Sequence, residues 1–109
     1  MKRLLLTIGA CVCLSAHAEF KDGNALYNDI RDSSYFSQGV GLGYIMGAAD
    51  ASRGVAHCIP PNVTAGQVLD MTKQYLEEYP ALRHFTADMI VGRVLGRVWP
   101  CEKKKGNTL

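Results

Sequence analysis

The sequence predicts an all-α protein, a compact bundle of about four short helices stapled by one disulfide. Apolar residues after residue 22 recur at spacings of three and four, which places them on one face of a helix. Residues that cap helices stand before these runs, and glycine or proline follows them. No internal repeat, low-complexity run or linker interrupts the chain. We therefore expect a single helical domain over residues 19–102.

The N-terminal segment 1–18 has the pattern of a secretory signal peptide. Lys2 and Arg3 precede an apolar run over 4–14, and Ala16-His17-Ala18 supplies the small residues of a cleavage site. The apolar run is too short to span a bilayer as a permanent anchor. We expect cleavage after the last of these alanines and a periplasmic protein without membrane contact. A retained helix and a lipidated cysteine are the less favoured alternatives.

Cleavage also changes the charge of the chain. Removing 18 of the 109 residues leaves 91, in which ten Lys and Arg face ten Asp and Glu. A net charge near zero gives no indication of a nucleic acid or an anionic membrane as a partner. The last basic run, Lys103 to Lys105, lies in 103–109, which we expect to be a flexible solvated tail.

Four cysteines become two, since Cys11 and Cys13 belong to the predicted signal peptide. Cys58 and Cys101 remain as an even pair in a chain bound for an oxidising compartment, which favours a disulfide. Closing a loop of about forty residues restricts the unfolded chain and stabilises the fold by about 4 kcal/mol. The alternative is a catalytic thiol at Cys58 beside His57.

The first two helices are expected over 23–33 and 35–53. Asp22 can cap the first helix, and Asp32-Ser33-Ser34 separates it from the second. The apolar side of the first helix is Leu26, Tyr27 and Ile30. The apolar residues of the second are Tyr35, Phe36, Val40, Tyr44, Ile45 and Ala48.

Small residues recur every four positions in the second helix, at Gly39, Gly43, Gly47 and Ala51. On a helix they line one ridge, which lets a neighbouring backbone approach closely. Each glycine costs up to about 1 kcal/mol of helix propensity, so we expect close helix packing to compensate. A membrane dimer motif is the alternative, but the segment also carries the polar residues Gln38, Asp50 and Arg53.

The third helix is expected over 65–79. Gly54 is expected to end the second helix, and Pro60-Pro61 keeps the intervening loop irregular. Thr64 and Gln67 fit a capping box at the start of the third helix. Its predicted buried stripe is Val68, Leu69, Thr72, Tyr75, Leu76 and Tyr79.

The fourth helix is expected to follow a connector and to run to Val98. Pro80 ends the third helix, and Thr86 can cap the fourth. Trp99-Pro100-Cys101 stops the fourth helix. The residues expected to face inward are Ile90, Val91, Val94, Leu95 and Val98.

The residues after the signal peptide show no catalytic or metal-binding pattern, so we expect neither an enzyme nor a cofactor. His57 and His84 are the remaining histidines, and no Cys or His pair has ligand spacing once the disulfide forms. Asp50 stands out because it lies in an apolar helix, where a charge needs a partner. We expect a buried ion pair or a capping role, with Arg83 or His84 as the partner.

An ordered set of motifs resembles the Rap/Tai immunity proteins of type VI secretion: Gly43-Tyr44-Ile45-x-Gly47-x-x-Asp50-Ala51, Cys58-Ile59-Pro60, Val63-Thr64-x-x-Gln67, Tyr75-Leu76-Glu77, Pro80-x-Leu82-Arg83-His84-x-x-Ala87 and Trp99-Pro100-Cys101. The set covers nearly all of the mature chain. Within it we expect structural roles for Gly43, Tyr44, Gly47, Asp50, Pro60 and Trp99.

The resemblance implies a periplasmic all-α protein, often a homodimer, that protects its cell from a peptidoglycan amidase injected by sibling cells. Inhibition in that family works by occluding the active-site cleft of the amidase, so the immunity protein itself does no chemistry. Two alternatives remain open from the sequence: a small acid-stress chaperone of the periplasm, and an inhibitor of another cell-wall hydrolase.

The chain also departs from that family. Its members often carry a second cysteine pair, one in the first helix and one just before the Leu-Gly-Tyr sequence. Those places hold Ile30 and Gly41 here. The loss of both together is coherent, because neither thiol is left unpaired. The departure bears on how firmly the first helix is held and on which toxin is recognised.

The connector between the third and fourth helices is the predicted partner-binding site. A surface that plugs a cleft needs aromatic or arginine anchors. The connector supplies Tyr79, Arg83, His84 and Phe85, with Glu78 as a charge at the rim. Burial of Tyr79 and Phe85 in the core is the alternative.

Overall fold

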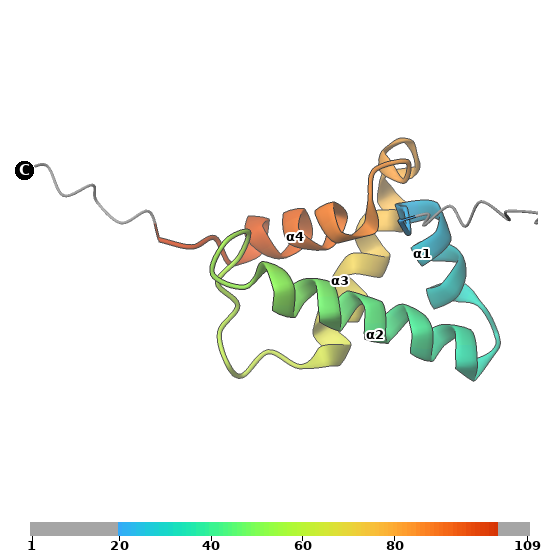
Figure 1. The fold of residues 1–109 in the computed structure, drawn as a ribbon, viewed down its shortest axis with the longest axis horizontal. Helices are drawn as coiled ribbons and strands as arrows, with labels where there is room; N and C mark the ends of the chain where they lie inside the picture. Colours follow the sequence, from blue (N-terminus) through green and yellow to red (C-terminus); the bar gives the residue numbers. More distant parts are fainter. Residues whose placement is uncertain (1–19, 103–109) are drawn as a thin grey trace, which may run out of the picture.

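The computed structural model describes residues 20–102, which form four α-helices and a short 3-10 turn (Figure 1). The elements are α1 (Gly23–Arg31), α2 (Tyr35–Ser52), α3 (Ala65–Glu78), the turn η1 (Pro80–Leu82) and α4 (Ala87–Val98). α2 and α4 lie alongside each other, α3 crosses behind them, and α1 closes one end. The predicted all-α bundle is confirmed. The predicted signal peptide and basic tail lie outside the described residues.

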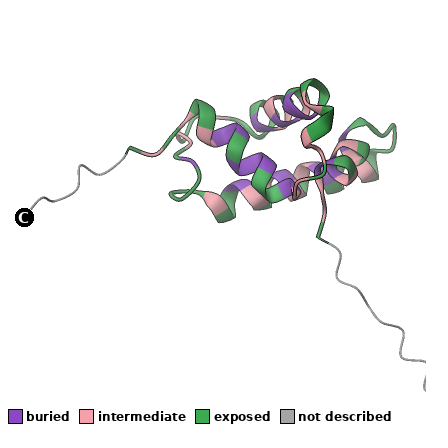
Figure 2. Ribbon diagram, turned by 90° about the horizontal axis from the view of Figure 1, so that it is seen from above, coloured by how far each residue is buried: buried purple, intermediate pink, exposed green. Residues whose placement is uncertain are grey.

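One apolar core holds the bundle together, and all four α-helices contribute to it (Figure 2). Leu26, Ile45, Leu76 and Leu95, one from each helix, are fully buried. Burying a side chain of this size contributes about 1.5–3 kcal/mol. Within residues 20–102, no helix is long and apolar enough to cross a membrane.

The helix ends follow the capping residues that the sequence indicates, and they lie within two residues of the predicted ends. The Asp22 carboxylate accepts the Ala25 N–H at 2.8 Å. Thr64 and Gln67 form the predicted reciprocal capping box. Gly54 follows α2 with a φ of +78°, a conformation that glycine adopts without steric cost.

The Thr86 side chain does not cap α4, so this prediction is wrong. Thr86 stands at the N-cap position, but the first N–H of the helix, that of Ala87, donates to the Lys21 carbonyl at 2.9 Å. An isolated antiparallel bridge between Asp22 and Thr86 brings the two chain segments together. Backbone pairing therefore satisfies the first N–H of α4, whereas a side-chain cap would have accepted the N–H of Asp88 or Met89.

The predicted glycine ridge of α2 (Gly39, Gly43 and Gly47) faces solvent, so the expected close helix packing there is wrong. A Cβ atom added to any of these three glycines would meet nothing within 4 Å. The buried side of α2 instead runs through Gly41, Ile45 and Ala49. Burial of the bulky Ile45 side chain sets which face turns inward, because it removes more apolar area from water than a glycine can.

Close packing occurs at other glycines. A Cβ on Gly96 would clash with the carbonyl oxygen of Ala56, and one on Gly92 would lie 3.2 Å from the Ala56 Cβ. The turn after α2 therefore rests directly on the backbone of α4. A Cβ on Gly41 would lie 2.7 Å from Cγ2 of Ile30. Ile30 and Gly41, which stand where the Rap/Tai proteins often carry a second cysteine pair, thus lie in contact with each other.

Gly96→Ala is expected to lower the free energy of unfolding by about 1–3 kcal/mol, because the added methyl group meets backbone atoms of Ala56. Gly66→Ala is the matched control, since the same change near the start of α3 meets only Oγ1 of Thr64, at 3.8 Å. It is expected to raise the free energy of unfolding by up to about 1 kcal/mol through helix propensity. Urea unfolding followed by circular dichroism measures both. Equal effects would contradict the packing described above.

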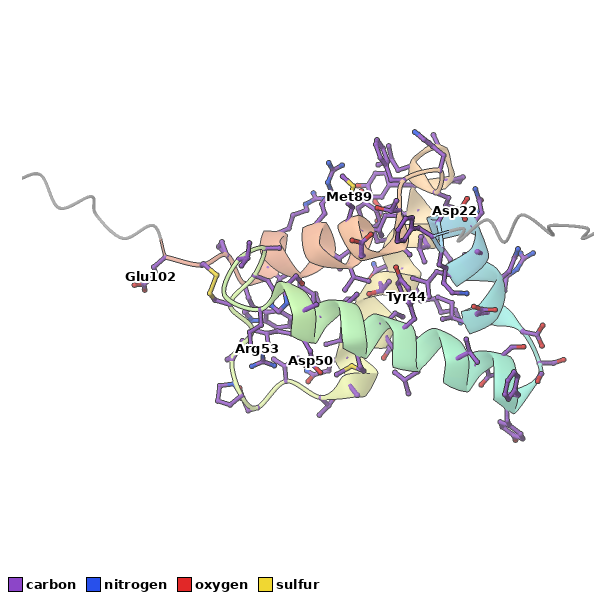
Figure 3. The ribbon with its side chains drawn as sticks, viewed as in Figure 1. Asp22, Tyr44, Asp50, Arg53, Met89 and Glu102 are labelled. Atoms are coloured by element: carbon purple, nitrogen blue, oxygen red, sulfur yellow. A yellow bond between two sulfur atoms is a disulfide. The ribbon has the colours of Figure 1, made fainter. Side chains whose placement is uncertain are left out.

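Cys58 and Cys101 are joined, with their Cα atoms 4.8 Å apart, which confirms the predicted disulfide and rules out a free thiol at Cys58 (Figure 3). The bond fastens the loop after α2 to the end of α4. The Cys58 N–H donates to the Trp99 carbonyl at 2.8 Å in the same junction. His57 is fully buried beside it, and its Nε2–H donates to the Ala49 carbonyl at 2.7 Å. His57 therefore helps to close this end of the bundle.

Candidate partner-binding surface

The connector, residues 79–86, projects at the end of the bundle where α1 meets α4 (Figure 1). Glu78 and His84 are exposed, whereas Tyr79, Arg83 and Phe85 are half-buried. Tyr79 and Phe85 also pack against the apolar core. The structure therefore brings the five predicted residues to one end of the molecule but gives them different amounts of free surface.

Arg83 supports the connector from inside. Its Nε donates to the Leu76 carbonyl near the end of α3 at 2.6 Å. Its guanidinium carbon lies 4.0 Å from the centroid of the Tyr27 ring, a cation–π contact with α1. These contacts link the connector to two helices and satisfy a helix carbonyl that has no partner within α3.

The start of α1 holds the connector backbone. The Gly23 N–H donates to the Phe85 carbonyl, and the Asn24 N–H donates to the Arg83 carbonyl, both at 3.0 Å. A Cβ on Gly23 would lie 2.9 Å from the Arg83 Cα, so this close approach requires glycine. The free N–H groups at the helix start thus fix the connector before any partner arrives, which reduces the entropy lost on binding.

His84 and Phe85 form what we name the aromatic tip. Their ring centroids are 4.4 Å apart. The His84 Nδ1–H donates to the Ala81 carbonyl at 2.9 Å, which leaves Nε2 as the acceptor of the neutral ring. The Phe85 ring is backed by Ile90 and by Arg93 of α4, whose guanidinium carbon lies 5.8 Å from the ring centroid. The aromatic tip therefore presents an apolar face and one hydrogen-bond acceptor on a fixed backbone.

α4 adds to this surface exposed side chains that are not among the predicted partner-binding residues. Met89 and Val98 are 56% and 54% exposed. The prediction that Val98 faces inward is wrong, because it borders an open groove of about 500 Å³ between α3 and α4 together with Glu78 and Arg97. The sequence could have indicated this exposed face of α4, because Met89, Arg93 and Arg97 recur at every fourth residue, on the side away from the buried stripe.

Asp50 is exposed, so the predicted buried ion pair with Arg83 or His84 is wrong. The orientation of α2 in the bundle places both its glycine ridge and Asp50 on the solvent side. Asp50 lies there near Arg53 (Figure 3). The ion pair found among residues 20–102 instead joins Lys21 to Asp29 of α1.

The other residues with predicted structural roles lie around the core. Tyr44 and Trp99 are half-buried and pack against it. Pro60 is half-buried, and its carbonyl accepts the Val63 N–H at 3.3 Å in the loop before α3. In the described part of the chain, no group of three His, Cys, Asp or Glu side chains is placed to hold a metal ion.

Burial raises the pKa of the Tyr44 phenol above 10.0, and the nearby Asp88 carboxylate acts in the same direction. The unfolded chain therefore loses this proton first as the pH rises, so stability falls from about pH 10 upward. Tyr44→Phe is expected to make this alkaline loss of stability shallower, as measured by urea unfolding across that range. Tyr35→Phe, at a phenol that is 91% exposed, is the control. An unchanged alkaline slope in Tyr44→Phe would contradict the expectation.

Residues 22–101 match a family model described as Rap1a immunity proteins. No curated protein matches the chain. The matched range begins at the Asp22 cap of α1 and ends at Cys101 of the disulfide, so it includes all four helices and the connector.

Proposed function

Because the chain belongs to the Rap1a immunity protein family, we propose that it binds a peptidoglycan amidase delivered by type VI secretion and blocks the active-site cleft of that toxin. The observation that carries the proposal is the aromatic tip, which lies on a connector fixed by α1, α3 and α4. A rigid aromatic projection can enter a cleft without losing much conformational freedom.

Inhibition would then be a matter of occlusion. Phe85 supplies apolar contact area, and the free Nε2 of His84 can accept a hydrogen bond from a donor in the cleft. Exposed Glu78 lies beside the open groove and can set the orientation of the partner at the rim. The protein itself would perform no chemical step in this mechanism.

We also place this action in the periplasm. Peptidoglycan lies there, and the sequence begins with the pattern of a secretory signal peptide. The Cys58–Cys101 disulfide supports this compartment, because disulfides persist where the environment is oxidising.

Protection of a cell tests the proposal. Each candidate amidase effector of the same genome would be exported to the periplasm of a laboratory host, with or without the full chain. We expect lysis with the amidase alone and, for at least one amidase, normal growth when both are present. Lysis in both cases for every amidase, with the immunity protein present at the same level as the toxin, would overturn the proposal.

We further propose that two copies pair through the outer side of α2, as the family resemblance implies a homodimer. Tyr35 and Phe36 are 91% and 81% exposed there. Antiparallel pairing about Gly43 would place Asp32 of one copy near Arg53 of the other, so the charges at the two ends are complementary. Sedimentation is expected to show a dimer that Phe36→Glu converts to a monomer. A wild-type monomer at cellular concentration would exclude the pairing.

A further inference from the structure

A second groove runs along the outer side of α4, next to the turn that follows α2. Gly92, Gly96 and Ala56 form its floor, and it has a volume of about 510 Å³. The floor is rigid, because both glycines pack directly on Ala56. Arg93 and Arg97 line the same groove, so a flat apolar floor lies beside two cationic side chains.

Arg93 and Arg97 have no acidic partner among the residues that the structure describes. Among residues 20–102 the salt bridge joins Lys21 to Asp29, and no carboxylate of that range lies within 4.0 Å of Arg93 or Arg97. Asp88 also borders the groove, at the first turn of α4, near Tyr44. Two positive charges and one negative charge therefore line this groove.

The positive groove contrasts with the rest of the domain. The described residues contain nine Asp and Glu against seven Lys and Arg. Arg31 and Arg83 lie over the Tyr27 ring, and Lys21 is paired with Asp29. Arg93 lies over the Phe85 ring, but within residues 20–102 the side chain of neither Arg93 nor Arg97 donates a hydrogen bond, so their guanidinium N–H groups can bind an outside anion.

This groove is continuous with the connector. Arg93 lies 5.8 Å from the Phe85 ring centroid. Met89 lines the groove and also the small pocket behind Phe85. Figure 3 shows Met89 on the outer side of α4, beside the connector. A partner that holds the aromatic tip in its cleft would therefore have its cleft rim over α4.

We propose that the groove along α4 binds an acidic segment on the cleft rim of the toxin, with Arg93 and Arg97 paired to Asp or Glu side chains and Met89 in apolar contact. The proposal rests on the proposed function and assigns the chemistry of the partner surface. Guanidinium groups bind carboxylates through two parallel hydrogen bonds, which fix orientation as well as charge. The α4 arginines would therefore select among amidases that share a similar active site.

Binding to a catalytically inactive form of the amidase against which the chain protects cells tests the proposal. Arg93→Glu and Arg97→Glu are each expected to weaken the affinity at least tenfold at low salt. In the double variant added salt should no longer weaken binding, because the two glutamates repel the acidic segment and salt screens that repulsion. Lys73→Glu is the control, because it reverses a charge on α3 at a residue that lines neither of the two grooves. It should bind like the wild type. Thermal melting of each variant checks that the fold is intact.

The outcomes separate this inference from the proposed function. No binding of the wild type to the amidase would overturn the proposed function itself. Wild-type binding together with unchanged affinity in the Arg93 and Arg97 variants would overturn only the acidic-segment proposal. Vesicles of phosphatidylglycerol are the third probe. If the double variant loses vesicle binding and keeps its affinity for the amidase, the groove binds anionic lipid and the proposal is wrong.

Discussion

Replacing Cys58 and Cys101 together by alanine is expected to lower the free energy of unfolding by about 4 kcal/mol. The disulfide closes a loop with a sequence separation of 43 residues, which contains α3, the connector and α4. Without it the unfolded chain gains the freedom of that whole segment. A small domain has about 5–15 kcal/mol of stability in total, so the loss would remove a large part of it.

Urea unfolding of the oxidised wild type, the reduced wild type and the double alanine variant measures this effect. The reduced wild type is the control, since it keeps both sulfur atoms and separates loss of the bond from loss of side-chain packing. We expect the reduced wild type and the double alanine variant to unfold at a much lower urea concentration than the oxidised wild type. The circular dichroism of all three folded proteins should be similar at low temperature. A loss below about 1 kcal/mol in both would contradict the expected effect of closing so long a loop.

The elements that the sequence predicted correctly are those with local signals. Asp22 precedes its helix, and Thr64 and Gln67 stand three residues apart at theirs, so the cap and the helix can be identified from adjacent residues. The disulfide followed from compartment and cysteine number alone. None of these predictions required knowledge of how the helices pack.

The orientation of α2 could not be predicted in the same way. Its apolar and small residues surround the helix, so periodicity alone does not identify one buried face. The glycine ridge and Asp50 were expected to be buried, yet both face solvent. Which face of α2 is buried depends on the contact of Gly41 with Ile30 of α1 and on the packing of Ile45 in the core. Both are contacts between separate helices.

The binding surface was predicted in part for the same reason. The composition of the connector pointed to the correct part of the molecule, but Arg83 turns inward because Leu76 and Tyr27 offer it partners. Those partners belong to α3 and α1, which the local sequence cannot place. Arg93 and Arg97 were missed because a charged outer side is usual for a helix, and only the glycine floor beside them distinguishes this one.

Truncating the aromatic tip, with His84→Ala and Phe85→Ala together, is expected to weaken binding of the amidase by about 30- to 1,000-fold. Aromatic anchors at the centre of an interface typically contribute about 2–4 kcal/mol each when removed, and paired effects are not additive. The loss should fall mainly on the dissociation rate, since the tip makes its contacts after encounter. Binding kinetics on the inactive amidase and survival of cells that express the active form measure it.

The control for this variant is Val55→Ala, which truncates a side chain that is 86% exposed in the turn after α2. Its affinity should equal that of the wild type. Phe85 also packs on the core, so the double variant will lose some stability. His84→Ala alone separates the two effects, because its ring is exposed and lies outside the core cluster. If His84→Ala and the double variant both protect cells as well as the wild type while remaining folded, the connector is not the inhibitory element, and another surface must cover the cleft.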